Sequence, residues 1–242
     1  TLFRSRSGTV IENGVPCSNS LISANYDGWI DLFEWGTSGY NHGAVCYQPW
    51  VYSSSLYDHY AYGDSTNNLN DQTGEADWGY NAISNGGNLE NMWRTLTGDE
   101  WKYVLFARST SFGIRYAKAQ VNGIKGLILL PDNWNSSTFN LSSPNTHGAY
   151  YDSNIISMSD WTTKLEANGA IFLPAAYSRH NNVLVNMGLG SLEGGISGNY
   201  WTATRNDWEF VFRLDFADFD IGLFGSHPGF GHHVRLVQNK NK

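Results

Sequence analysis

The sixteen residues Trp93–Arg108, WRTLTGDEWKYVLFAR, constrain the fold more than any other short stretch of the chain. Thr97 followed three residues later by Glu100 is a capping box, in which each side chain accepts the other residue's backbone N–H at a helix start. Trp101 and Leu105 then lie four residues apart, on one face of a helix. We therefore expect a helix that begins at Thr97 and packs through an apolar face.

A second helix is expected over Asp160–Ala167, with Trp161 and Leu165 on its apolar face. Gly169 suits the left-handed residue that commonly ends a helix. Two serines precede this helix and are candidate caps: Ser157 and Ser159.

Extended apolar segments follow the two helices, at Val121–Leu130 and Ala170–Pro174. The first 75 residues favour strands and long loops, and from Gly198 onward the pattern is strand and turn. Two modest helices with many short strands are typical of an α+β fold. Because no Pro/Ser-rich linker interrupts the chain, we expect residues 1–242 to form a single domain.

Charge and hydropathy exclude several classes of partner. The net charge of -7 gives no electrostatic reason to bind nucleic acid or anionic lipid. The longest apolar run, Gly126–Leu130, has the length of a strand and not of a membrane span. The chain begins at Thr1, so we expect a mature or trimmed polypeptide that has lost any signal peptide.

The only cysteines are Cys17 and Cys46. They are either two buried thiols or one disulfide closing an N-terminal loop, which would stabilise the fold by roughly 2–4 kcal/mol. Two cysteines are too few for a zinc ribbon or a disulfide scaffold.

Several motifs resemble known proteins. Trp93–Trp101 resembles the helix of the formylglycine-generating-enzyme family, a variant of the C-type lectin fold. Gly198–Trp201 and Gly231–Val237 resemble the frame that brackets the variable region of ligand-binding proteins diversified by retroelements, especially those of gut Bacteroidetes and their phages. Further parts resemble the same bacterial group: Asp77–Asn85, Val121–Pro131 and Gly169–Ala175.

The resemblance covers about residues 77–238, and residues 1–76 match it only loosely. It implies a C-type lectin-like α+β fold whose C-terminal strands, residues 198–238, carry a variable ligand-binding region. The implied partner is an unidentified protein or glycan on a cell or phage-host surface. The implied location is secreted or at the cell surface, with a lipid anchor, a pilus or a phage as candidate carriers.

The enzymatic chemistry of the family requires reactive cysteines late in the domain, which bind copper and activate oxygen. Here Cys46 is the last cysteine, so we expect no oxidase activity, no enzyme of this kind and no cofactor. The seven histidines are scattered, and the adjacent pair His232–His233 would point to opposite faces of a strand. Three acids are candidates for paired carboxylates of a hydrolase: Asp215, Asp218 and Asp220. Acidic residues in a strand–turn–strand are usually solvated, and no second element obviously completes such a site.

The function is expected in the C-terminal hairpin. Five apolar residues alternate with polar ones and are expected to face the core: Phe212, Leu214, Phe216, Ile221 and Leu223. Four others are then expected to face outward: Arg213, Asp215, Asp220 and Phe224. Exposed aromatic side chains grouped with Arg, Asp and His are typical of a binding surface.

We expect Tyr200 and Trp201 to form a frame beneath this surface. The candidate contact residues are Arg205, Asn206, Asp207, Trp208, Arg213, Asp215, Asp218, Phe219, Asp220, Phe224, His227, Phe230 and His232.

Composition supports a diversified window. Residues Phe210–His233 contain half of the twelve Phe of the chain but no Lys, Glu, Gln, Met or Trp. In the retroelement family, adenines of template Asn codons are randomised, and this cannot produce any of those five residue types.

Three alternatives stay open. One is a calcium-dependent carbohydrate-binding lectin or adhesin of the cell surface or pilus, because Asn206–Asp207 resembles a calcium-ligand pair. Its usual loop partner is absent, since Gly194 follows Glu193. Another is an enzyme-like structural module of a surface assembly. In the third, the Phe residues fill the core, and the tyrosine-rich loops of Tyr47–Tyr62 carry the function.

Overall fold

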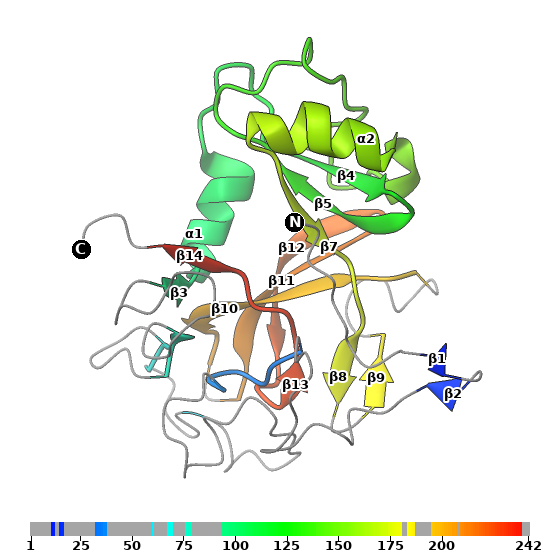
Figure 1. The fold of residues 1–242 in the computed structure, drawn as a ribbon. Helices are drawn as coiled ribbons and strands as arrows, with labels where there is room; N and C mark the ends of the chain where they lie inside the picture. The colour runs from blue at the N-terminus through cyan, green and yellow to red at the C-terminus, as the bar shows by residue number, and fades with distance from the viewer. Residues whose placement is uncertain are drawn as a thin grey trace.

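The computed structural model describes residues 11–12, 15–16, 32–37, 60, 67–69, 76–78, 93–180, 183–186, 195–207 and 209–238. Over these residues the protein is a mixed α+β structure with two helices and several small, mostly antiparallel sheets (Figure 1). The fold class expected from the sequence is confirmed at this level. Several residues named above lie outside the described residues: Thr1, Cys17, Cys46, Glu193, Gly194 and Trp208. Most of the tyrosine-rich stretch 47–62 also lies outside them.

Helix α1 (Gly98–Lys102) begins at the predicted cap. The Oγ1 atom of Thr97 accepts the N–H of Glu100 at 3.1 Å, and the Glu100 carboxylate accepts the N–H of Thr97 at 2.8 Å. Trp101 and Leu105 are both 0% exposed. The capping box and the apolar face are therefore confirmed.

The helix continues as a π-helical turn, η5 (Tyr103–Ala107), before the chain becomes extended at Arg108. The buried face of these two helical pieces packs against Tyr116 and Leu127 of the neighbouring sheet. The helix is thus short but fully anchored on one side.

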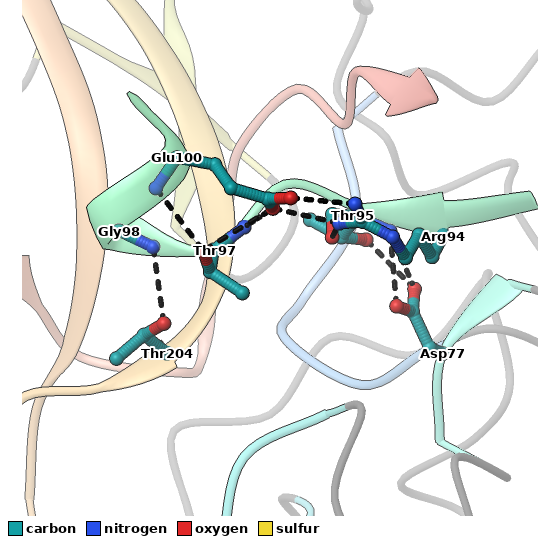
Figure 2. A network of polar contacts seen from close by, with 7 residues as sticks. All are labelled: Asp77, Arg94, Thr95, Thr97, Gly98, Glu100 and Thr204. Carbon is teal, nitrogen blue, oxygen red and sulfur yellow. Dashed lines mark hydrogen bonds and ion pairs between the residues drawn. The ribbon is translucent and has the colours of Figure 1, made fainter. Parts of the chain in front are cut away.

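Figure 2 shows how the start of α1 is connected to two other elements. Arg94, in strand β3 (Trp93–Thr95), donates two hydrogen bonds to the Glu100 carboxylate, at 2.7 and 2.5 Å. The N–H of Gly98 donates to Oγ1 of Thr204 at 3.0 Å. Bidentate Arg–carboxylate pairs add geometric specificity as well as energy. The helix start is therefore fixed relative to β3 and to the C-terminal part of the chain.

The Asp77 carboxylate connects a distant segment to β3 (Figure 2). It accepts the N–H and the hydroxyl of Thr95, at 2.9 and 2.8 Å. It also accepts the N–H of Trp78 at 2.8 Å. Asp77 and Thr95 are only 3% and 1% exposed. A buried carboxylate requires such donors, so these hydrogen bonds position residues 76–78 against β3.

A four-stranded sheet forms the upper part of the molecule in Figure 1. Its strand order is β6-β4-β5-β7, with β4 and β6 parallel and the other pairs antiparallel. Asn122 and Gly123 form the β4–β5 turn with φ values of 50° and 80°, a conformation that suits an Asn-Gly pair. The strands are β4 (Tyr116–Val121), β5 (Ile124–Leu129), β6 (Ile155–Ile156) and β7 (Ile171–Pro174).

A helical segment of three pieces lies across this sheet (Figure 1). The Oγ atom of Ser157 accepts the N–H of Asp160 at 3.0 Å, and Gly169, with φ 88°, ends the segment. Trp161 and Leu165 are buried against the sheet. The second predicted helix is therefore confirmed, with the earlier serine as its cap. The pieces are α2 (Met158–Asp160), η7 (Trp161–Leu165) and η8 (Glu166–Asn168); a separate short turn is η6 (Tyr151–Ser153).

Strands β10 (Gly198–Arg205), β11 (Val211–Ala217) and β12 (Asp220–Ser226) form an antiparallel sheet in that order (Figure 1). One face of this sheet shares a core with α1 and with the four-stranded sheet. At Gly198, a Cβ atom would lie 2.0 Å from the ring of Phe216. Only glycine leaves room for that ring, so β10 and β11 can pack as closely as they do.

The opposite face of this sheet is covered as well. Trp201, Ala203 and Val211 form a core cluster with Trp35 and Leu69, which come from the N-terminal part of the chain. The remaining strands pair as β13-β8-β9, β14-β3 and β1-β2. Their bounds are β1 (Ile11–Glu12), β2 (Val15–Pro16), β8 (Ser178–His180), β9 (Val183–Val185), β13 (Phe230–Gly231) and β14 (Leu236–Gln238).

Among the described residues, no helix combines the length and the apolar character that crossing a membrane requires.

Replacing Trp101 or Trp161 by Ala is expected to lower the free energy of unfolding by about 3–5 kcal/mol, because each indole is buried in a packed core. Tyr103→Ala is the matched control, since Tyr103 belongs to the same helical segment and is 57% exposed. Urea denaturation of the three variants measures the difference. A Trp101→Ala chain as stable as the control would contradict the packing of α1.

Candidate functional site

Strands β11 and β12 form the predicted hairpin. Leu214 pairs with Leu223, and Phe216 pairs with Ile221. Directly paired residues share one face of a sheet, so these four side chains point the same way. Leu214, Phe216 and Ile221 are at most 2% exposed, and Phe212 on the same face is half-buried. The register and the core-facing set are therefore confirmed.

The expectation that Arg213 and Asp215 face solvent is wrong. They are 8% and 1% exposed, because the second face of the sheet is also covered. The Arg213 guanidinium donates to the Asn199 side chain at 2.8 Å, to the Gly225 carbonyl at 2.6 Å and to the Asp215 carboxylate at 2.9 Å. Arg213 thus connects all three strands and is unavailable to a ligand.

Two more predicted contact residues, Arg205 and His232, are buried for the same reason. The Arg205 guanidinium carbon lies 5.1 Å from the Trp35 ring centroid, and one of its nitrogens donates to the Tyr60 carbonyl at 2.9 Å. His232 is 0% exposed, with its ring centroid 4.3 Å from that of Trp201. Both side chains therefore contribute to packing beneath the surface.

The other predicted contact residues divide between the two ends of the hairpin. Strand β11 has seven residues, and at 3.4 Å for each residue the ends lie about 20 Å apart. The structure does not bring all of the predicted residues into one surface. The turn end carries Asp218, Phe219 and Asp220, and the open end carries Asn206, Asp207, His227 and Phe230.

At the turn end, the predicted residues bind other parts of the protein. Asp218 accepts the N–H of Tyr151 at 2.6 Å, and the N–H of Phe219 donates to the Ala149 carbonyl at 3.2 Å. Phe219 itself has φ 67°, as the turn requires. The Asp220 carboxylate lies 3.7 Å from Nδ1 of His147. This end is docked on residues 147–151, so we assign it to the scaffold.

Lys118 completes that docking from β4. Its Nζ donates to the carbonyls of His147 at 2.6 Å and Asp220 at 2.9 Å, although the residue is 1% exposed. Burial lowers the pKa of Lys118 to about 8, while Asp218 and Asp220 oppose the shift. No pattern in the sequence indicated this lysine, because its partners are carbonyls from two distant loops.

At the open end, Asn206, Asp207, Glu209 and Phe210 belong to the loop between β10 and β11. The Asp207 carboxylate accepts the N–H groups of Glu209 at 2.9 Å and Phe210 at 2.7 Å. The Asn206 N–H donates to the Phe210 carbonyl at 3.0 Å. Asn206 and Phe210 are exposed, the latter by 36%. The loop also approaches Gly225, where a Cβ atom would lie 3.1 Å from the Asn206 side chain.

The loop between β12 and β13 completes this end. Nδ1 of His227 accepts the N–H of Gly229 at 3.0 Å. The Phe230 ring lies 6.3 Å from His227 and 4.8 Å from His180, measured between ring centroids. Burial lowers the pKa of His227, and the charge of Glu209 opposes this shift. Half-buried Phe230 and His227 therefore lie together here with exposed His180, which the pairing of β8 with β13 brings to this end, and Glu209 is near His227.

Sequence reasoning missed three residues of this end. Glu209 and Phe210 adjoin the predicted set, and the Asp207 side chain that holds both of their N–H groups was the available signal. His180 had no local signal. Phe224 was predicted to face outward; it lies on the same face as Arg213, half-buried, with its ring over Gly222. Trp208 lies outside the described residues.

We define the open-end surface as Asn206, Asp207, Glu209, Phe210, His180, His227 and Phe230. The three acids that were candidates for a hydrolytic pair do not belong to the open-end surface. Asp215 bonds Arg213, Asp218 bonds a backbone N–H, and Asp220 lies at the turn end. Within the described parts of the chain, no three His, Cys, Asp or Glu residues are placed to hold a metal ion. The arrangement suits non-covalent binding by aromatic and polar contacts.

Comparison with known proteins gives no match to a family model, to a curated protein or to a solved structure.

The Arg213→Met variant is expected to lose about 3–5 kcal/mol of unfolding free energy, because it leaves the Asp215 carboxylate buried without its cation. The double variant Arg213→Met, Asp215→Leu should recover part of the loss. The exposed neighbour Asn206→Ala serves as the control and should change stability by under about 0.5 kcal/mol. Thermal or urea unfolding measures the change in stability. An Arg213→Met chain as stable as the control would contradict the burial of Arg213.

Proposed function

We propose that this protein is a non-enzymatic ligand-binding protein with a C-type lectin-like fold of the formylglycine-generating-enzyme type. Its C-terminal strands display a surface diversified by a retroelement, and the ligand is a protein or glycan on another cell or phage-host surface. The observation that carries the proposal is the open-end surface. There, exposed Phe210, half-buried Phe230 and polar side chains lie on a backbone held by side-chain hydrogen bonds from Asp207 and Arg213.

The scaffold beneath this surface is rigid in a way that suits variation above it. Arg213 holds the Gly225 carbonyl, and Gly225 adjoins the loop residues Asn206 and Phe210. Recognition by loops on a rigid sheet allows side chains to change without changing the fold. The proposed set of contact residues is therefore smaller than the set predicted from the sequence. The buried members of the predicted set support the surface from beneath.

Two sequence features support the same proposal. The motif Trp93–Trp101 forms a capped helix whose start is bonded to Arg94 and Thr204. The frame motifs Gly198–Trp201 and Gly231–Val237 lie side by side, because the Trp201 N–H donates to the His233 carbonyl at 2.8 Å. In a variable protein of this type, such a frame would hold the ends of the variable segment together.

The first test separates surface from core by stability and binding. Asn206→Ala, Phe210→Ala and His227→Ala should each leave the melting temperature nearly unchanged, since surface changes usually cost under about 0.5 kcal/mol. Phe210 is the residue most expected to weaken binding, by more than about 1–2 kcal/mol, because aromatic anchors dominate binding energy. Phe216→Ala is the matched core variant and should destabilise the chain by about 3 kcal/mol or more.

Binding partners for this test come from panning a displayed random-peptide library and from a glycan array. Each is run once with calcium and once with a chelator. Calcium-independent capture that the Phe210 variant loses would support the proposal. Capture that requires calcium would favour the carbohydrate-binding lectin instead. Capture unaffected by all three surface variants would contradict the open-end surface as the site.

The second test is the neighbouring DNA and independent copies of the gene. We expect a reverse transcriptase gene and a near copy of the 3′ end that carries Asn codons at varied positions. Variation should fall on codons of the open-end surface, such as those of Phe210 and His227. It should spare those of Leu214, Phe216 and Arg213, because these residues are buried. Variation spread evenly over buried and exposed codons would contradict the proposal.

A further inference from the structure

Four of the seven histidines of the chain lie together at the base of the open-end surface. We call His180, His227, His232 and His233 the histidine cluster. Phe230 contacts three of them, with ring centroids 4.8 Å from His180, 6.3 Å from His227 and 6.2 Å from His232. The fourth, His233, stacks on Tyr200 at 5.1 Å. More than half of the histidines of the chain thus gather in one place.

The rings of His232 and His233 are buried on opposite faces of β10. His232 faces Trp201 on one side of β10 and bonds Oγ of Ser226 through Nε2 at 2.8 Å. His233 faces Tyr200 on the other side. His232 and His233 are 0% and 7% exposed. One nitrogen of each ring, Nδ1 of His232 and Nε2 of His233, is buried without a side-chain hydrogen-bond partner. The backbone of Gly231 favours a charged His232 through a hydrogen bond, but burial and the neighbouring cations outweigh it.

The charged groups around His232 oppose a further positive charge. Arg213 from β11 and Arg179 from β8 both face it, along with His233. Each of these guanidinium groups already has a carboxylate beside it: Asp215 lies 2.9 Å from Arg213, and Glu34 lies 3.7 Å from Arg179. Neither acid is among the groups that stabilise a charged His232.

Protonation is disfavoured accordingly. Burial, then Arg213, hold the pKa of His232 well below its usual value, and burial lowers the pKa of His233 to about 4. Burial also lowers the pKa of His227, opposed by Glu209 and reinforced by His180. An opened segment would expose these rings with ordinary values near 6.5. As the pH falls below that value, the opened state binds protons that the closed state does not bind. The closed state therefore loses stability relative to the opened state as the pH falls.

The segment that carries these rings is held by short pairings. His232 exchanges two backbone hydrogen bonds with Phe33, at 2.9 and 3.0 Å. His233 donates its N–H to the Asn199 carbonyl at 3.0 Å and accepts from Trp201. Strand β13 pairs with β8 over only two residues, whereas β11 pairs with β12 over seven. Strand β14, in the same segment, pairs with β3 over three residues. Each pairing that holds this segment is therefore shorter than the pairing within the hairpin.

We propose that the histidine cluster is an acid-sensitive switch: as the pH falls below neutrality, protonation of His232 and His233 releases residues 227–238 from β3, β8, β10 and Phe33. The consequence for binding rests on the proposed function, because Phe230 and His227 belong to the open-end surface and move with this segment. A ligand held at neutral pH is released in an acidic environment. Protonated histidine clusters act in this way at protein interfaces.

The test is backbone hydrogen exchange of the full chain without ligand, followed by mass spectrometry from pH 7.5 to pH 5.0 and corrected for intrinsic exchange rates. Peptides from residues 227–238 report the switch, and peptides from residues 116–129 report the scaffold. At pH 5.0, the opening equilibrium of the first set should rise roughly 30-fold for each buried ring that is protonated only when open. The second set should hold its protection.

The matched variants are His232→Gln with His233→Phe, which keep a hydrogen-bonding group and a ring but do not titrate. They should remove the acid dependence, and His147→Gln, at a histidine outside the cluster, should retain it. Unchanged protection of residues 227–238 in the parent chain overturns the proposal, as does equal loss in residues 116–129, which means global unfolding. The parent series decides this even when the double variant fails to fold. Since no ligand is used, failure here is distinct from failure of the proposed function.

Discussion

Strand β11 is buried on both faces, so its alternating side chains cannot divide into a core set and a solvent set. Leu214 and Phe216 pack toward α1 and the four-stranded sheet. Arg213 and Asp215 point into a second layer that contains Trp35 and Trp201. Charges in such a layer must be paired, because an uncompensated buried charge costs several kcal/mol. The hydrogen bonds of Arg213 to β10, Asp215 and β12 follow from that requirement.

Local interactions explain which parts of the fold the sequence could predict. The capping box of Thr97 and Glu100 lies within four residues, and the turn at Gly169 depends on one φ value. The register of the hairpin follows from alternation alone, because a one-residue slip would send Phe216 away from the core. The burial of Arg213 had no comparable signal. Polar–apolar alternation is the same for a sheet with one solvent-exposed face and for a sheet whose second face is covered by another layer of the protein.

The candidate site was predicted in part for a related reason. A contiguous window of sequence does not form a contiguous surface when it folds into a hairpin, since the two ends separate by about 20 Å. Asp218 and Asp220 therefore lie far from Asn206, although all were expected in one site. His180 arrives through the pairing of β8 with β13, a contact that no local pattern encodes. Its neighbour Phe230 was predicted from its own segment.

Buried charges seldom stabilise a fold as well as apolar side chains of the same volume, so their value here is positional. Arg213 fixes the carbonyl of Gly225, and a side chain at that position would meet Asn206 and Phe210. The loop therefore lies close to β12 at this glycine. Asp207 adds a second constraint, because its carboxylate holds two N–H groups of the same loop. Arg213 acts from a buried position, whereas Asp207 belongs to the open-end surface itself. On the proposed function, side chains of that surface other than Asp207 can therefore differ without altering the loop that carries them.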